Sequence, residues 1–192
     1  MLIQHEAQFK ELISNSGRIN QAIDIAETLA IPNYYIAGGV VAQVIWNQLA
    51  GLDIHSNIKD VDVIYFDASE SKAQRAEREA LFTALSKKQF LLDMTNQAFV
   101  HEWYRNQSGG QVKPLTSAGQ GIDTWLSAFA VGIRGRDYQI YAPYGLTDLF
   151  AMQLRPNSLQ MGRAVYLKMV ASYTRRWPQL RADPWDDSSQ DH

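Results

Sequence analysis

Apolar residues at three- and four-residue spacing alternate along the chain with short, continuous apolar runs, which predicts helices interleaved with strands. Helical spacing covers most of the first thirty residues and is interrupted by a turn-forming Ser-Asn-Ser-Gly stretch at 14–17. An aromatic and β-branched run predicts a buried strand over 34–37, and helical spacing resumes directly behind it over 40–49. The N-terminal quarter is therefore expected to form two helices, a strand and a third helix.

The same alternation continues through the middle of the chain. A β-branched and aromatic run predicts a second strand over 59–67, and a run at 90–95 predicts a third. Between them, the charge-rich segment 69–88 carries apolar residues on one side only, as a helix that covers a surface does. A strand–helix–strand–helix–strand order is typical of a sheet with helices packed on it.

The C-terminal half is expected to contain a glycine-rich loop, a hairpin and further helices. The loop covers 105–121, and its part from 107 to 121 has the composition of a mobile lid over a bound ligand. Two apolar runs flank Arg-Gly-Arg-Asp and predict a hairpin over 128–142. The remaining helices are expected over 117–125, 145–154 and 163–177. The last of them carries an apolar stripe expected to face the core, formed by Tyr166, Met169, Val170, Tyr173 and Trp177.

Composition narrows the class of protein. The chain has 192 residues, of which 46% are apolar, so one compact domain with a substantial core is expected. It has no cysteine, which excludes disulfides, thiolate nucleophiles and cysteine-based zinc sites. No apolar run reaches the ~18–20 residues of a membrane helix, and the first residues lack the layout of a signal peptide. We therefore expect a soluble cytoplasmic protein.

Charge is unevenly distributed. The net charge is −2, and four aspartates stand within the last ten residues (Asp183, Asp186, Asp187 and Asp191). We therefore expect a single domain over 1–182, which without those four charges is mildly basic, and an acidic, disordered tail over 183–192. The domain is only mildly basic and has no run of basic residues, which argues against nucleic-acid binding as its main function. Nucleic acid is therefore expected only as an acceptor in a reaction.

Candidate chemistry begins where the first strand ends. Gly38 and Gly39 separate that strand from the helix behind it. Bare backbone amides at a helix N-terminus attract phosphate oxygens, and glycine lets a ligand approach closely. Paired glycines also occur in ordinary tight turns, so this signal is weak by itself.

Two carboxylates follow at the start of the second strand. Side chains alternate across a strand, so Asp60 and Asp62 share one face, ~6.5–7 Å apart along the chain. Asp93 in the third strand faces away from the more apolar side, and would join them if the two strands are neighbours. Carboxylates that converge repel each other unless a cation or proton lies between them, and Mg²⁺ binds such oxygens. The alternative is three solvated or turn-capping aspartates.

Several of these residues resemble a known family. Ala37-Gly38-Gly39-Val40 and Lys59-Asp60-Val61-Asp62-Val63 resemble the core motif of the DNA polymerase β-like nucleotidyltransferase superfamily. More narrowly, the chain resembles a bacterial family of nucleotidyltransferase-like proteins over about 30–180. The segments that carry this likeness are 96–101, 142–149, 155–157 and the ending Lys168…Arg176-Trp177-Pro178.

The resemblance implies an α+β nucleotidyltransferase fold, with a mixed sheet and additional helices at both ends. It implies Asp60, Asp62 and Asp93 as catalytic residues and ligands of Mg²⁺ or Mn²⁺. It also implies transfer of a nucleoside monophosphate from a nucleoside triphosphate to a hydroxyl acceptor of unidentified kind, with release of pyrophosphate. The superfamily often has glycine–serine where this chain has Gly38-Gly39, which removes one hydroxyl that could hold a phosphate.

Other polar residues have two interpretations each. Gly38 and Gly39 would bind phosphate through their amides, and Lys168 is a further candidate for the triphosphate, although a solvated basic helix face is common. Asn96, Gln97 and His101 are candidates to contact a base or ribose, or else a polar cluster that fastens the third strand. The alternative function is a non-catalytic nucleotide-binding or partner-binding protein of the same fold, with exposed Trp177 and Trp185 in an interface.

Overall fold

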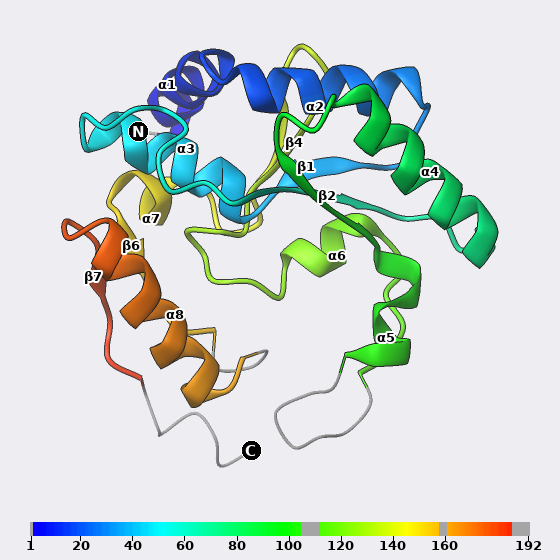
Figure 1. Ribbon diagram of the computed structural model, residues 1–192. Coiled ribbons are helices and arrows are strands. Elements are labelled where there is room, and N and C mark those ends of the chain that lie inside the picture. The colour runs from blue at the N-terminus through cyan, green and yellow to red at the C-terminus, as the bar shows by residue number, and fades with distance from the viewer. Residues whose placement is uncertain (1, 105–111, 158–160, 186–192) are drawn as a thin grey trace.

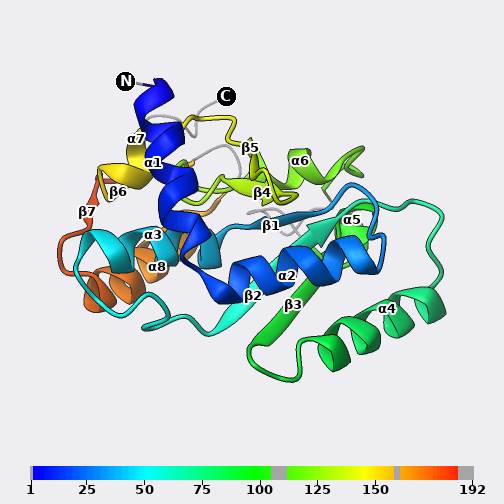
Figure 2. The ribbon, with the colours of Figure 1, turned by 90° about the horizontal axis from the view of Figure 1, so that it is seen from above.

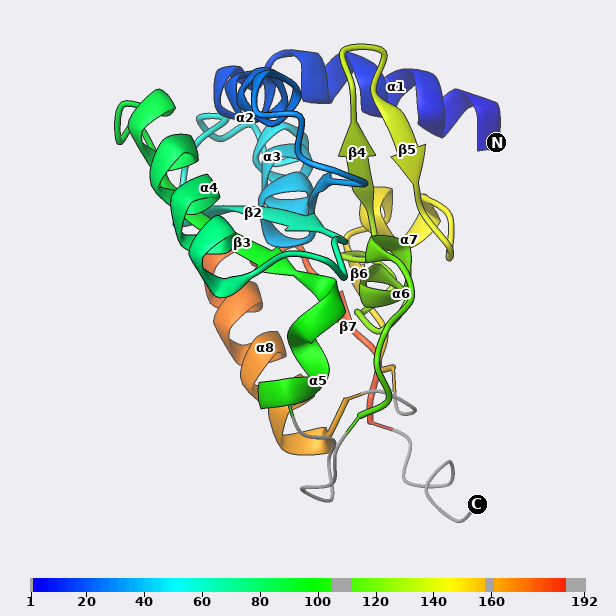
Figure 3. The ribbon, with the colours of Figure 1, turned by 90° about the vertical axis from the view of Figure 1, so that its right-hand side faces the viewer.

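The computed structural model describes residues 2–104, 112–157 and 161–185 (Figure 1). A five-stranded sheet of order β3-β2-β1-β4-β5 forms its centre. Helices α1 and α2 lie on one side of this sheet, and α5, α6 and α8 lie on the other (Figures 1 and 3). The predicted α+β class, mixed sheet and extra helices at both ends are confirmed.

The elements follow the predicted order closely, but the helix predicted over 145–154 is a single turn at 147–150, and residues 153–154 form a short strand. In chain order they are α1 (Leu2–Ser14), α2 (Gly17–Thr28), β1 (Tyr35–Ala37), α3 (Gly39–Leu49), β2 (Asp60–Tyr65), α4 (Lys72–Leu85), β3 (Leu91–Asn96), the 3₁₀-helix η1 (Gln97–Phe99), α5 (Val100–Trp103), α6 (Ala118–Ile122), β4 (Gly132–Arg134), β5 (Gln139–Tyr141), α7 (Thr147–Phe150), β6 (Gln153–Leu154), α8 (Arg163–Arg176) and β7 (Arg181–Ala182). No helix among the described residues is both long enough and apolar enough to span a membrane.

The directions of the strands determine which residues meet. Strand β1 pairs antiparallel with both β2 and β4, and β4 pairs antiparallel with β5. Strand β2 pairs in parallel with β3, and α4 makes the crossover between them. Figure 2 shows α2 above β1 and β2, with α4 alongside β3. A parallel pair brings the same ends of both strands to one edge of the sheet, so the start of β2 lies beside the start of β3.

The main core fills the space between the sheet and the N-terminal helices. Ile19 and Ile23 of α2 and Val61 and Val63 of β2 have no exposed surface. A smaller apolar cluster on the opposite face joins the sheet to α6, and its buried members are Ala37, Ile64, Ala118, Ile122 and Ala130. The even-numbered positions of β2 therefore face α6, on the side where the candidate site lies.

The last helix packs through its predicted apolar stripe. Trp177, which follows α8, has no exposed surface, and its Nε1 donates a hydrogen bond to Asn47 Oδ1 at 2.9 Å. Its place on the core-facing stripe is therefore as predicted, and the alternative in which Trp177 is exposed in an interface is wrong. Its indole contacts Trp46 at 5.7 Å between ring centroids, because the chain bends back onto α3 at the end of α8.

The chain stays attached beyond β7. The carboxylate of Asp183 accepts hydrogen bonds from Arg155 and from Gln153, both at 2.7 Å. Trp185 packs on Tyr166 with ring centroids 5.7 Å apart. Asp183 and Trp185, at the start of the acidic tail predicted over 183–192, thus contact the domain. The part of the tail from 186 to 192 lies outside the described residues.

The predicted lid lies only partly within the described residues. Positions 107–111 of the lid predicted over 107–121 lie outside them. From Val112 onward the segment leads into α6, where Ser117 caps the helix by accepting a hydrogen bond from the Gln120 amide at 3.2 Å. Gly119 and Gly121 of this helix are buried, so this part of the segment packs against the domain.

Candidate functional site

The three predicted carboxylates come together on one face of the sheet. Asp62 and Asp93 are partners in the register of the parallel strands β2 and β3. Asp60 precedes Asp62 by two residues and shares its face, while the intervening Val61 is fully buried on the other side. The sequence-based expectation that these strands are neighbours is met. We call Asp60, Asp62 and Asp93 the carboxylate cluster.

Crowding of negative charge changes the acidity of the central member. Burial, followed by the negative charges of Asp60 and Asp93, raises the pKa of Asp62 from 3.8 to about 7. Hydrogen bonds from the backbone N–H groups of Val40 and Gly39 act in the opposite direction and lower this pKa. A carboxylate held under repulsion near neutral pH is a place that favours a cation.

The two glycines shape the turn beside this cluster. Gly38 has a positive φ of 64° and donates its amide to Val131 O at 3.1 Å. A Cβ on Gly38 would also stand 2.9 Å from the Trp125 ring, so both the backbone conformation and the space require glycine. In this structure the Gly38 amide is thus engaged within the protein, not directed at a phosphate site.

Gly39 starts α3 and lies against the cluster. A Cβ there would stand 3.0 Å from Gln43 Nε2 and 3.3 Å from Asp62 Oδ2. Its absence lets the Asp62 carboxylate reach the N-terminus of α3, where the partial positive charge of the helix stabilises an anion. The amide predicted to bind phosphate therefore holds Asp62 in this structure.

The donor set at the cluster fits a hard divalent cation. No three His, Cys, Asp or Glu side chains within the described ranges already stand close enough together to enclose a metal ion. Mg²⁺ needs only one or two protein carboxylates, because it takes its other oxygens from water and substrate phosphates. Burial of Asp62, together with the negative charges of Asp60 and Asp93 beside it, is the observation that favours a cation here.

Helix α8 contributes two residues that the sequence did not single out. The Tyr173 hydroxyl stands 3.8 Å from the place of a Cβ on Gly39. Burial and the charges of Asp62 and Asp60 raise the pKa of Tyr173, and Arg176 opposes them. The Arg176 guanidinium lies 4.3 Å from the Tyr173 ring centroid and donates to Asn57 O at 3.3 Å. A cation thus stands beside Tyr173, near the start of β2.

Tyr173 and Arg176 were difficult to identify as site residues from the sequence. Tyr173 belongs to the apolar stripe of α8, so its spacing marks it as a core residue. Arg176 does stand in the Arg176-Trp177-Pro178 ending that resembles the family. This ending is the sequence feature that could have identified Arg176 as a candidate site residue.

Lys168 is not brought to the cluster. Its side chain is exposed on α8, and it is not among the residues that line the cavity at Asp62 and Asp93. At about 100° per residue it lies roughly 140° around the helix from Tyr173. A role for Lys168 in binding triphosphate stays a prediction.

A cavity of about 830 Å³ opens beside the cluster. Asp62 and Asp93 stand at one end of it, and Gln97 and Trp103 line it farther along β3 and α5. Its volume lies within the range of pockets that hold small molecules. We call it the Gln97 cavity.

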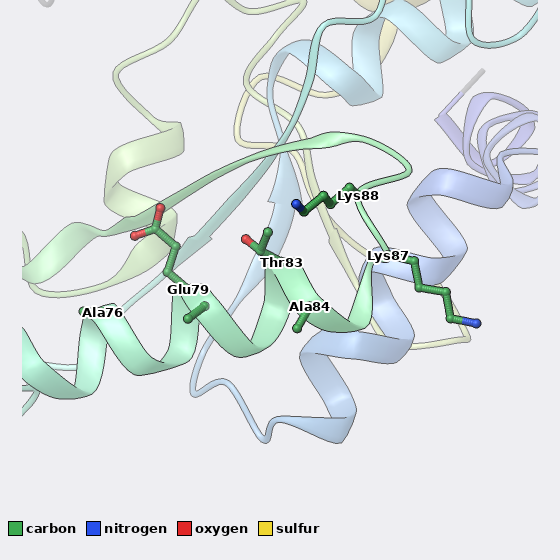
Figure 4. Close-up of a pocket in the computed structure, with 7 residues that line it drawn as sticks. Ala76, Glu79, Thr83, Ala84, Lys87 and Lys88 are labelled. Carbon is green, nitrogen blue, oxygen red and sulfur yellow. The ribbon is translucent and has the colours of Figure 1, made fainter.

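A second hollow of about 680 Å³ lies on α4 (Figure 4). Glu79 and Thr83 point into the space above the helix, Lys88 extends toward Thr83, and Lys87 points away. None of the predicted site residues lines it. It is an open hollow on the helix surface that is lined by exposed charged residues and alanines, so we assign it no chemistry.

The three polar residues after β3 separate into different roles. Asn96 fastens the strand end, because its Nδ2 donates to Asp67 O at 2.9 Å and to Glu70 Oε2 at 2.7 Å. Gln97 lines the cavity instead. His101 lies on α5, outside the lining of the cavity.

The resemblance noted from the sequence is supported by comparison with known proteins. A model of a family described as nucleotidyltransferase matches residues 24–182. Among curated proteins no match was found. A solved NMR structure described as revealing a CCA-adding enzyme head domain has a TM-score of 0.77 and 22% sequence identity, and covers 93% of this chain and 96% of that chain. At this identity the likeness shows the fold alone. Because the family model spans most of the sequence, the chain belongs to the nucleotidyltransferase family.

Proposed function

We propose that the protein transfers a nucleoside monophosphate from a nucleoside triphosphate to a hydroxyl acceptor and releases pyrophosphate. One observation carries this proposal beyond family membership. Asp62 and Asp93 face each other across the parallel strands β2 and β3, directly in front of the N-terminus of α3. A crowded carboxylate pair beside a helix N-terminus suits a substrate that brings both a divalent cation and phosphate groups.

The carboxylate cluster would hold the cation. Asp60 and Asp62 are the proposed ligands of Mg²⁺ or Mn²⁺, joined by Asp93 as a further ligand. The chemistry that such an ion supplies is neutralisation of charge on the phosphate oxygens and orientation of the triphosphate. For the protein, binding the ion relieves the repulsion that raises the pKa of Asp62.

The reaction itself is a displacement at the α-phosphorus. A bond forms between the hydroxyl oxygen of the acceptor and the α-phosphorus, while the bond to the oxygen bridging the α- and β-phosphates breaks. Pyrophosphate leaves with that bond pair, and the Asp93 carboxylate accepts the proton of the attacking hydroxyl. Asp93 suits this role because it lines the cavity next to the cluster.

The triphosphate is proposed to lie on the side of α3 and α8. Gly39 leaves room there for a close approach, and Arg176 supplies a cation next to Tyr173. Gly38 contributes by shaping the turn, because its amide is bonded to Val131 O. Because Lys168 lies on another face of α8, it would contact only the part of the substrate that lies away from the carboxylate cluster.

Calorimetric titration of the full chain with each nucleoside triphosphate, with and without Mg²⁺, tests the binding step. Wild-type protein is expected to bind at least one triphosphate only when Mg²⁺ is present, and Asp62→Asn is expected to abolish that binding. Glu77→Gln on the exposed face of α4 is the matched control and keeps it. Binding that is independent of Mg²⁺, or that survives Asp62→Asn, contradicts the proposed site.

Turnover is measured separately, as release of pyrophosphate in the presence of hydroxyl compounds. Asp93→Asn is expected to reduce release more than it weakens triphosphate binding. Metal-dependent binding without release for any acceptor would instead support the non-catalytic nucleotide-binding alternative.

A further inference from the structure

We propose that the Gln97 cavity is the acceptor site and that its occupant is a nucleoside-type acceptor, whose base lies against Trp103 and is recognised by the Gln97 amide. This rests on the proposed function, because it assigns the molecule that supplies the attacking hydroxyl. Nothing in family membership specifies that molecule.

The first step is the position of the cavity relative to the cluster. Asp62 and Asp93 line it, and it continues past Ile64 and Thr95 toward the C-terminal ends of β2 and β3. Arg176 lies at the opposite end, since it donates to Asn57 just before β2 begins. Figure 1 shows α8 and α5 at opposite ends beneath the sheet. The carboxylates thus separate a cation-bearing end from the cavity.

The charge of the cavity decides which substrate each end suits. Lys113 is the single cationic side chain among the described residues that line it. A triphosphate needs more positive charge than that, so the end at Arg176 and the N-terminus of α3 suits the donor better. The attacking hydroxyl must then come from the cavity, next to Asp93.

Gln97 is the polar group that points to a ligand. Its side chain is only 6% exposed and lines the cavity. Gly121 packs against it so closely that a Cβ there would stand 2.2 Å from Gln97 Oε1. The amide is thus fixed between Gly121 and the cavity, where a ligand can form hydrogen bonds with it.

The chemistry of that partner follows from the amide and its surroundings. A glutamine side chain presents a donor and an acceptor side by side, which matches the polar edge of a nucleobase. Trp103 is 62% exposed at the cavity wall, and an exposed indole is a surface on which a base stacks with little sequence preference. Val100 and Leu115 supply further apolar wall.

Other acceptor classes fit less well. A polycationic acceptor would need unpaired carboxylates beyond the cluster. Asp123 also lines the cavity, but its Oδ1 accepts the Tyr141 hydroxyl at 2.7 Å. A saccharide can pack its C–H face on the Trp103 indole but lacks the planar edge that pairs a donor with an acceptor opposite the Gln97 amide. A nucleoside satisfies both the amide and the indole.

The experiment measures binding of unphosphorylated nucleosides to the full chain by ligand-detected NMR without metal. Because nucleosides lack phosphate, their binding does not depend on the donor end. At least one nucleoside is expected to bind while ribose alone does not. Trp103→Leu is expected to weaken binding about tenfold, whereas Leu91→Ala, at an exposed residue of β3 outside the cavity lining, is expected to leave it unchanged.

Gln97→Met removes both hydrogen-bonding atoms at similar volume and is the second variant. It is expected to weaken binding and to reduce discrimination among the four nucleosides. If Trp103→Leu weakens Mg²⁺-dependent triphosphate binding instead, the cavity holds the donor base and the acceptor assignment is overturned. If triphosphates bind but no nucleoside does, the acceptor class is wrong while the proposed function stands. If nucleosides bind but no triphosphate does, the proposed function fails.

Discussion

Asp62 and Asp93 lie opposite each other in the parallel pair of β2 and β3. With Asp60 on the same face, this pairing places three like charges beside one another, and only the backbone N–H groups of Gly39 and Val40 counter them at Asp62. The carboxylate cluster therefore destabilises the folded domain, and the hydrophobic core offsets this effect. Such local destabilisation is expected at a site that binds a charged ligand.

Asp62→Asn is expected to stabilise the protein in the absence of metal at pH 8 by roughly 1–3 kcal/mol, because it removes the central charge of the cluster. Urea denaturation measures the free energy of unfolding. Glu77→Gln, on an exposed helix face, is expected to change it by less than about 0.5 kcal/mol. Loss of stability in Asp62→Asn would mean that the carboxylate serves mainly to cap α3.

The same residue predicts how stability depends on pH. Its pKa is raised from 3.8 to about 7 in the folded state, so between these values the folded protein holds a proton that the unfolded chain has lost. The contribution of Asp62 to the free energy of unfolding therefore falls as pH rises from about 4 to 7 and is constant above. Urea denaturation at a series of pH values should show this decline in wild type, and a smaller one in Asp62→Asn.

Gly39→Ala and Gly17→Ala form a matched pair, since each glycine is the first residue of a helix. A Cβ on Gly39 would press on Gln43 and Asp62, whereas a Cβ on Gly17 would meet nothing within 4 Å. We expect Gly39→Ala to fold but to weaken Mg²⁺-dependent triphosphate binding at least about tenfold, which is ~1.4 kcal/mol. Gly17→Ala should leave binding unchanged and stabilise the protein by ~0.5 kcal/mol. Equal binding in both variants would contradict the close approach of Asp62 to α3.

Two truncated chains test whether the contacts of residues 183–185 with the domain contribute to stability. A chain that ends at Ala182 loses the Asp183–Arg155 ion pair, the hydrogen bond from the Tyr166 hydroxyl to Asp183 O and the packing of Trp185. We expect this to lower stability by roughly 1–3 kcal/mol. A chain that ends at Trp185 should melt as the full chain does. Identical melting of both truncations would show that these contacts contribute nothing.

Most of the secondary structure could be predicted because each long element buries one face, and burial imposes a period on the sequence. Strands β6 and β7 escaped prediction, since two residues cannot display any alternation. Trp177 was correctly predicted on the core-facing stripe, whereas its partner Asn47 was not predictable, because the bend after α8 is a tertiary feature.

The candidate site was predictable only in part. Alternation along β2 places Asp60 and Asp62 on one face, and strand–helix–strand order favours β3 as a neighbour. The partners of the Gly38 and Gly39 amides were not predictable, because Val131 and Asp62 are distant in sequence and meet them only in the folded chain. Tyr173 is hidden for the same reason, as its position in an apolar stripe conceals the hydroxyl at its tip.

The crossover through α4 has a consequence for how such a chain tolerates change. Phe82 is the one fully buried side chain of this helix, whose outer face is open to solvent. Its N-terminal half is fixed by Arg75 and Arg78, which pair with the buried Glu70. Residues added after Phe82 would therefore disturb little packing. A slip of one residue between β2 and β3 would instead turn Asp93 to the opposite face of the sheet. Insertions in the connection between β2 and β3 are therefore expected to be tolerated, whereas a change in the register of these two strands is not.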